Sequence, residues 1–237
     1  MRAQSHVVGV ALLLGITVVA LGGLTLAVGA LVDAGTASAD AARVAGELDA
    51  ALQPVETTGP RATRVHFASG TLHTVEREVR LLENGSVVDR HSVGALVFES
   101  GDRRVAYLAG AVVRGRPGAA WLAADPPVTA SERNAVLVAG IPRLGAGHVA
   151  LSGEGGTAVT LATNVSHART DLGTGRFAVA IETATPGAFE RYFEGQNASV
   201  SRVDFDGDGV ESVVAEYPGQ RRGYLVVHDL SLEVNGG

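Results

Sequence analysis

An uncharged run near the start of the chain limits what this protein can be. Residues 7–32 read VVGVALLLGITVVALGGLTLAVGALV, 26 residues without one charged side chain. As an α-helix this run would measure roughly 39 Å, whereas the hydrocarbon core of a bilayer is about 30 Å thick. An ordinary secretory signal has an apolar stretch of only about 7–15 residues, followed by a cleavage site of small residues. The run therefore predicts a transmembrane helix that the mature protein keeps.

The residues on either side of this run predict its orientation. The short polar leader, residues 1–6, carries Arg2 and the amino terminus, and Asp33 and Asp40 follow the run. Basic residues favour the cytoplasmic side of a membrane. We therefore expect a single-pass protein of the cell membrane, with its N-terminus in the cytoplasm and its C-terminal domain outside the cell.

The helix is expected to continue beyond the membrane as an amphipathic extension over residues 33–54. Small and apolar residues recur there at the spacing of one helical face: Ala41, Val44, Ala45, Leu48, Ala51 and Leu52. Charged residues take the other face in this interpretation: Asp40, Arg43, Glu47 and Asp49. Pro54 ends the helix at or before Gln53. The sequence thus predicts one helix of about fifty residues, roughly 75 Å long and broken or softened at Gly35.

Small residues recur along one side of the apolar run, at Ala11, Gly15, Gly22, Thr25 and Gly29. Such a stripe lets a second helix approach closely, so it is a candidate packing surface between copies of the helix. The alternative is that glycine and alanine are simply common in this chain and in membrane helices. The sequence does not decide between the two.

From residue 55 to residue 237 the sequence predicts one antiparallel, β-rich domain. Asn84-Gly85 lies between two apolar runs and favours a type I′ hairpin turn, whose two central residues both need positive φ. One short helix is expected at Pro186–Glu194, with Thr185 as its N-cap. The expected fold class is therefore α+β and mainly β, a long N-terminal helix followed by a sandwich-like extracellular head. Strands are expected at 71–82, 86–93, 94–99, 103–108, 111–114, 135–139, 157–162, 176–182, 199–205, 210–217 and 223–234.

Composition limits how the head can be stabilised, which partners the protein can bind and which source it comes from. All 19 basic residues are Arg, there is no Lys or Cys, and the formal net charge is −6. Without cysteine there is no disulfide framework, so the head must be stabilised by its core and sheets. A net negative chain without a basic run gives no electrostatic footprint for nucleic acid. The arginine-only, alanine- and glycine-rich composition suggests a high-GC or salt-adapted source.

The first residues resemble a known family. Residues 2–10, RAQSHVVGV, are similar to the class III signal sequence of archaeal type IV pilins, particularly haloarchaeal ones. The resemblance implies that a prepilin peptidase cuts between Ala3 and Gln4, so that the apolar helix stays on the mature protein. It also implies other pilin subunits as partners. Val8 stands where bacterial pilins have a glutamate, so a bacterial-style assembly contact is not expected.

Part of the head carries a second resemblance. Residues 94–115, GALVFESGDRRVAYLAGAVVRG, followed by a loop and ADPPV at 124–128, are similar to the heads of haloarchaeal pilin-like surface proteins. This resemblance implies a location and a fold, and it implies no activity.

Motifs for catalysis are absent from the sequence. It has no cysteine, nucleophile elbow, Walker loop, H-E-x-x-H or dinucleotide-binding glycine motif. The histidines of the head are scattered singly, without metal-ligand spacing. We therefore expect no enzyme activity and no cofactor apart from a candidate structural ion.

That candidate ion is calcium, in the segment DFDGDG at residues 204–209. Asp204, Asp206 and Asp208 alternate along a tight loop, and hard carboxylate oxygens suit Ca²⁺. The alternative is an acidic turn of a β-hairpin, because the later ligand of an EF-hand loop falls on Ala215 instead of on a carboxylate. Candidate glycosylation sites are Asn164 and Asn197, in sequons that we expect in turns or loops.

Two functional hypotheses follow from these features. The first is a pilin-like surface protein, a minor subunit of or accessory to an archaeal type IV pilus-like filament, assembled through its N-terminal helix. The alternative is a static membrane-anchored envelope or ligand-binding protein that forms no filament. A tethered hydrolase with an unusual site is a more remote third hypothesis.

Overall fold

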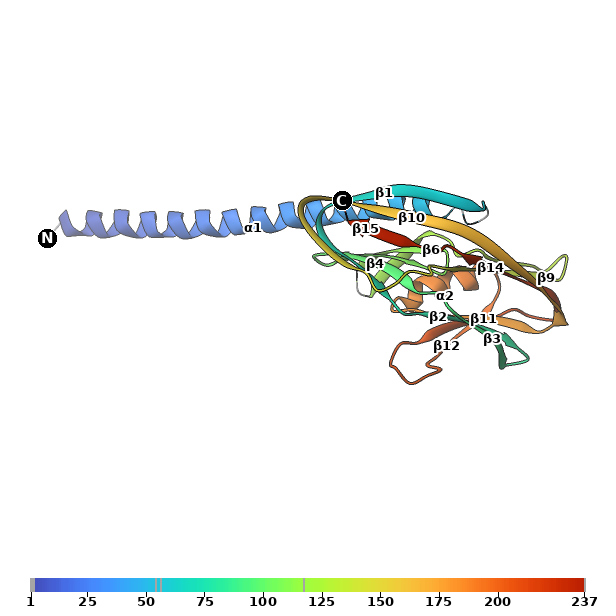
Figure 1. The fold of residues 1–237 in the computed structure, drawn as a ribbon. Helices are drawn as coiled ribbons and strands as arrows, with labels where there is room; N and C mark the ends of the chain where they lie inside the picture. Colours follow the sequence, from blue (N-terminus) through green and yellow to red (C-terminus); the bar gives the residue numbers. More distant parts are fainter. Residues whose placement is uncertain (1–2, 54, 56, 117, 237) are drawn as a thin grey trace.

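A long helix and a β-rich head make up the molecule (Figure 1). The computed structural model describes the backbone of residues 3–53, 55, 57–116 and 118–236, and their side chains except those of residues 3–11 and 30. Helix α1 (Ala3–Leu52) is continuous over 50 residues. This confirms the long N-terminal helix and its predicted end near Pro54. The head is mainly β and sandwich-like, as predicted.

Two sheets form the head. The larger has ten strands in the order β7-β6-β5-β4-β1-β10-β14-β9-β8, with β15 also paired to β10, and the smaller has the order β12-β13-β11-β2-β3. All pairs are antiparallel except β9 with β14. The strands are β1 (Gly59–Val75), β2 (Glu78–Glu83), β3 (Ser86–Ser92), β4 (Ala95–Ser100), β5 (Arg103–Leu108), β6 (Ala111–Arg116), β7 (Ala119–Ala124), β8 (Val128–Ser131), β9 (Val136–Arg143), β10 (Ala150–Gly175), β11 (Phe177–Glu182), β12 (Ser199–Val203), β13 (Ser212–Glu216), β14 (Arg221–Asp229) and β15 (Glu233–Gly236).

Two hydrophobic cores lie on opposite faces of the larger sheet. One is formed with the second half of α1, and includes Leu48, Phe67, Phe98 and Tyr107. The other fills the space between the two sheets and is closed by helix α2 (Pro186–Glu194), whose Phe189 is fully buried. The layers are therefore helix, large sheet and small sheet, and the docked part of α1 serves as an outer layer of the head.

Local sequence signals placed several elements correctly. The hairpin β2–β3 turns at Asn84 and Gly85, with φ of 50° and 81°, as a type I′ turn requires. The hairpin β4–β5 and helix α2 also form where predicted. Thr185 does take the N-cap position, but its side chain caps no backbone amide and instead bonds to the Thr183 hydroxyl. The prediction of a side-chain cap was therefore wrong.

Other strand predictions were wrong in ways that matter for the topology. The expected strand 71–82 is two strands, because the chain leaves the larger sheet after Val75 and enters the smaller one at Glu78. The expected strand 223–234 is likewise divided into β14 and β15. The long strands β1 and β10 pair from Gly59↔Val165 to His73↔Ala150, and only part of each was predicted. Much of their length is half exposed, which weakens the apolar pattern that sequence reasoning follows.

Candidate functional site

The first half of α1 extends away from the head (Figure 1), and its described apolar side chains are uncovered. From residue 12 to residue 36 every described side chain is exposed, and Leu26 is 78% exposed. Within the described part of the chain, α1 is the one helix long and apolar enough to cross a membrane. In water alone so much exposed apolar surface would be unfavourable. This half of the helix therefore requires an apolar environment or partner.

The candidate packing stripe lies on this exposed half. Gly15, Gly22 and Gly29 have no neighbouring atoms against which a Cβ would collide, and the Thr25 hydroxyl donates to the Leu21 carbonyl within the helix. The side chain of Ala11 lies outside the described residues, as do those of the predicted processing residues Ala3 and Gln4. The stripe is thus open to a second helix, and its use for packing stays a prediction.

The second half of α1 is bound to the head along one face. Its buried residues follow the predicted spacing, and they pack on β1, β4, β5 and β6. The predicted residues Ala41, Val44, Ala45, Leu48, Ala51 and Leu52 are all buried, and so is Ala37 one turn earlier. Burial of apolar area stabilises by about 25 cal/mol per Å², so this buried face contributes to the attachment of α1.

Asp40 adds a polar contact that the sequence did not indicate. Its side chain was predicted on the solvent face, but the residue is only 2% exposed. One carboxylate oxygen accepts hydrogen bonds from the amides of Ala68, at 2.8 Å, and Ser69, at 3.2 Å. These amides lie at the irregularity in β1 between Phe67 and Ser69. A bulge leaves amides unpaired in the ladder, and Asp40 satisfies them.

Further polar contacts hold α1 along its length. Near the middle of the docked half, Glu47 accepts a 2.5 Å hydrogen bond from the amide of His66. At the C-terminal end, the Tyr107 hydroxyl donates to the Leu52 carbonyl at 3.2 Å, and Gln53 donates to the Gly110 carbonyl. Burial raises the pKa of Tyr107 far above its usual value, and the negative charge of Asp49 raises it further.

Where α1 leaves the head, its neighbours are the β4–β5 turn and Arg114 of β6. A Cβ on Gly101 would lie 3.8 Å from that of Ala37. The Arg114 guanidinium donates to the Ser38 carbonyl at 3.3 Å and lies 5.6 Å from the ring of Trp121. The side chain of Trp121 is 48% exposed. This end of the head therefore faces along the helix toward its exposed half.

The candidate calcium loop joins β12 and β13, and it brings the three predicted carboxylates together. Oxygen atoms of Asp204, Asp206 and Asp208 lie within 4.8 Å of one another. Asp204 accepts hydrogen bonds from the Gly207 and Gly209 amides, which lower its pKa. Asp208 likewise accepts one from the amide of Val210. The donor set fits a hard cation in type, but the protein already satisfies these oxygens, so calcium binding stays a prediction.

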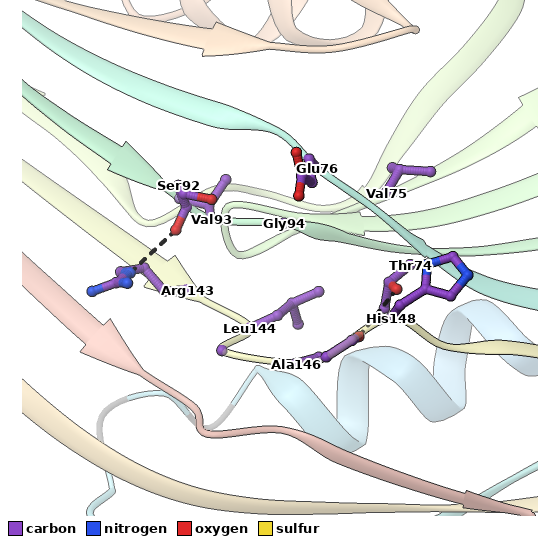
Figure 2. Close-up of a pocket in the computed structure, with 12 residues that line it drawn as sticks. Thr74, Val75, Glu76, Ser92, Val93, Gly94, Arg143, Leu144, Ala146 and His148 are labelled. Carbon is purple, nitrogen blue, oxygen red and sulfur yellow. Dashed lines mark hydrogen bonds between the residues drawn. The ribbon is translucent and has the colours of Figure 1, made fainter.

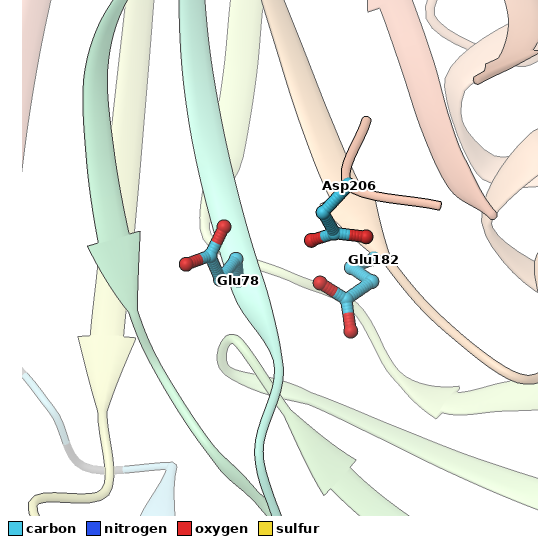
Figure 3. Close-up of side chains that lie close together, drawn as sticks. All are labelled: Glu78, Glu182 and Asp206. Atoms are coloured by element: carbon cyan, nitrogen blue, oxygen red, sulfur yellow. The ribbon is translucent and has the colours of Figure 1, made fainter. Parts of the chain in front are cut away.

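Asp206 of this loop lies close to Glu78 and Glu182 (Figure 3), and the buried Arg80 links these carboxylates. Its guanidinium lies 2.7 Å from Asp206, 2.5 Å from Glu78 and 3.8 Å from Glu182. The residue is 1% exposed and also stacks on the ring of Phe205. Burial raises the pKa of Glu182, against the opposing effect of Arg77 and Arg80. The guanidinium lies where a cation between these carboxylates would bind, so the cluster is an internal ion network.

Two histidines that are far apart in the sequence meet across β10 and β14. His167 and His228 are paired residues of the two strands, and their Nδ1 atoms are 2.9 Å apart. Nδ1 of His228 also lies 3.1 Å from the Val55 carbonyl oxygen. The pair borders a cavity of about 550 Å³ that Arg169 and Pro127 also line. Sequence spacing does not reveal this pair, because the register of the two strands brings the histidines together.

A smaller cavity of about 230 Å³ lies under the loop that follows β9 (Figure 2). Thr74 fastens that loop, since its hydroxyl accepts from the amide of Val149 and donates to the carbonyl of Gly147. Arg143 donates to the Ser92 carbonyl across the same cavity. The polar groups here already bind one another, so their evident role is to hold the loop.

The two candidate glycosylation residues lie in different settings. Asn197 is exposed just after α2, with φ of 60°, and so lies in a turn as predicted. Asn164 is exposed but lies within β10, opposite Pro60, so its predicted place in a loop was wrong.

Together, the fold and these sites define a class of protein: a single long helix, apolar and uncovered at one end, that carries a mainly β head on the other. The chain belongs to the family described as Family of unknown function (DUF7289), which it matches over residues 2–233. Comparisons with curated proteins and with solved structures found no match.

Proposed function

We propose that this protein is a pilin-like surface protein, a minor subunit of or accessory to an archaeal type IV pilus-like filament. The observation that supports this most directly is the division of α1. One half is apolar on every side and uncovered, and the other half is fastened to the head by a single face. Such a helix can pass from a bilayer into a bundle of like helices while its head stays folded outside the membrane.

The proposed course of events begins at the leader. A prepilin peptidase cuts between Ala3 and Gln4, and the helix remains in the membrane with the head outside the cell. On assembly the helix leaves the bilayer and packs against copies of itself, through the stripe that contains Gly15, Gly22 and Gly29. Small residues let helix backbones approach closely in such a bundle. No catalytic step is part of this proposal.

The experiment that tests it is N-terminal peptide mapping with intact mass of the full-length protein from its native membranes. We compare the wild type with Ala3→Asp, which blocks the small-residue site, and with Ala39→Asp as a matched control. Ala39 is exposed on α1 beyond the apolar run, so the same change there leaves processing intact. A mature start at Gln4 in the wild type and the control, lost in Ala3→Asp, supports the proposal.

A start at Met1 in all three proteins would contradict processing and favour the static membrane anchor. Recovery of the protein in sheared surface filaments separates a filament role from an anchoring role. If the processed protein stays entirely in the membrane fraction under conditions where filaments form, the filament part of the proposal is wrong.

A further inference from the structure

We propose that the end of the head nearest the exposed half of α1 docks on the anionic headgroups of the membrane that the helix crosses. The contact surface, here called the basal surface, consists of Arg103, Arg114, Arg116 and Trp121. The inference rests on the proposed membrane insertion of α1, and it adds a second membrane contact, made by the head itself.

The basal surface lies shortly beyond the end of the apolar run along the helix axis. The apolar run ends at Val32, and Ser38, which binds Arg114, lies six residues or about 9 Å further along the axis. The headgroup layer on each side of a bilayer is about 5–7 Å thick. With Val32 placed at the outer edge of the hydrocarbon core, the Arg114 guanidinium, which stacks on Trp121, lies at the outer boundary of that layer.

Strand β6 runs beside α1 in the direction of the exposed half of the helix. Its first end lies beside the far end of the helix, because Gln53 binds the carbonyl of Gly110, and Arg114 lies beside Ser38. The strand thus runs along α1 toward the membrane. Arg116 follows Arg114 by two residues and binds Asp102, which is next to Gly101 at the level of Ala37, five residues or about 7.5 Å beyond Val32. The exposed side chain of Arg116 is therefore within reach of the headgroup layer.

The basal surface has an excess of positive charge. Asp102 is shared by Arg103, at 3.3 Å, and Arg116, at 3.0 Å, and Arg114 contacts a carbonyl and an aromatic ring. Three arginines against one aspartate leave an excess of two positive charges, and Asp33 on the exposed helix at this level lowers it to one. The whole chain has a net charge of −6. A positive surface at this end of an acidic protein is complementary to lipid phosphate.

The chemistry of Trp121 completes the argument. An indole ring that is about half exposed beside arginines is the arrangement favoured at membrane interfaces, where the ring body is apolar and its N–H meets water. Trp121 is also the chain's single tryptophan. Its fluorescence therefore reports on the basal surface without any added label.

The test uses the full-length protein reconstituted into vesicles of zwitterionic lipid, with or without an added anionic phospholipid. A trace lipid that carries a nitroxide on its headgroup quenches nearby tryptophan. We expect quenching of Trp121, stronger with anionic lipid, and protection from acrylamide relative to the protein in detergent. Arg116→Gln should lower the ratio of docked to undocked heads about fivefold. Arg90→Gln on β3, whose side chain is 54% exposed against 51% for Arg116, is the matched control and should leave the quenching unchanged.

The possible outcomes separate this inference from the function on which it rests. Failure of the protein to float with the vesicles would overturn the membrane insertion and the docking together. Flotation without headgroup quenching of Trp121 would overturn the docking alone, and so would equal quenching with and without anionic lipid. Protection of Trp121 that depends on the protein-to-lipid ratio, and not on the labelled headgroup, would assign the surface to a second copy of this chain instead.

Discussion

The two halves of α1 form one continuous helix, yet their surroundings differ completely. Leu26 in the first half is 78% exposed, whereas Leu48 in the second half is fully buried. The first half is apolar all round, and the second is apolar along one face. The difference shows that the period of the apolar residues, more than their number, indicates what surrounds a helix. An apolar face fits a partner on one side, and an unbroken apolar surface fits an environment on all sides.

The largest expected effect on stability comes from shortening a buried side chain in the docked half of α1. Leu48→Ala should lower the free energy of unfolding of the head by about 2–5 kcal/mol, because it removes a fully buried side chain and leaves a cavity. The measurement is urea unfolding of the full-length protein in a neutral detergent, followed by Trp121 fluorescence. The matched control, Leu24→Ala in the exposed half, should stay within about 0.5 kcal/mol of the wild type. Equal effects of the two changes would remove the distinction between the halves.

A smaller loss is expected where the helix binds the bulge of β1. Asp40→Ala should cost about 1–3 kcal/mol, since the amides of Ala68 and Ser69 lose their acceptor in a buried place. Asp40→Asn retains one acceptor oxygen and should recover part of the loss. Hydrogen exchange should locate the effect, with faster exchange of these two amides in Asp40→Ala. Unchanged exchange there would mean that another group satisfies them.

Tyr107→Phe should lower the stability of the head modestly at neutral pH, and it should also change how stability depends on pH in alkali. Loss of its hydrogen bond to Leu52 should cost about 0.5–1.5 kcal/mol. Tyrosine in the unfolded chain ionises near pH 10, and burial raises the pKa of Tyr107 in the folded protein. Folding therefore keeps Tyr107 protonated, and stability should fall as pH rises above about 10.

The fall in stability at alkaline pH is easy to interpret in this chain. It has no lysine or cysteine, so in the unfolded chain the only side chains that ionise between about pH 9 and pH 12 are its four tyrosines. The pKa values of Tyr192 and Tyr217 are also raised by burial, so part of the decline persists in the variant. Unfolding measured from pH 8 to pH 11 should show a shallower decline for Tyr107→Phe. Identical slopes for the two proteins would contradict the burial of this hydroxyl.

The smallest effect is expected at the border between the halves. Gly35 lies on the exposed part of α1, and a Cβ there meets nothing within 4 Å. Gly35→Ala should favour the helix by about 0.4–1 kcal/mol and slow amide exchange around residues 34–37 by about two- to fivefold. The stability of the head should not change. A large change in head unfolding would show that the two halves are coupled through this point.

Local signals predicted the fold where one segment determines its own structure. The length of α1 followed from an apolar run and Pro54, and the β2–β3 turn from Asn84-Gly85. Strand β7 was missed because its sequence, AAWLAA, is rich in alanine and alternates weakly. The break after Val75 was missed because no turn residue interrupts the segment TLHTVEREVRLL, although its two ends belong to different sheets.

The polar sites were harder to predict, since they depend on contacts between distant segments. Asp40 lies opposite a bulge 28 residues away, and Arg80 binds an aspartate 126 residues away. The pairing of His167 with His228 depends on strand register. The acidic loop at residues 204–209 was visible because its three carboxylates stand at alternate positions of one short segment. Its partner Arg80 was not, because nothing near Arg80 in the sequence indicates burial.

The docking of α1 along the strands also determines how the molecule bears force. The contacts from Asp40 to Gln53 are spread along the helix axis, and β5 and β6 run beside it. A pull on the head along the axis of α1, with the helix held at its far end, acts parallel to this interface. The buried face and the hydrogen bonds at Asp40 and Glu47 then share the load and must break together, whereas a joint that peels would lose them one at a time. With respect to a pull along the helix axis, the helix and head therefore form a shear joint.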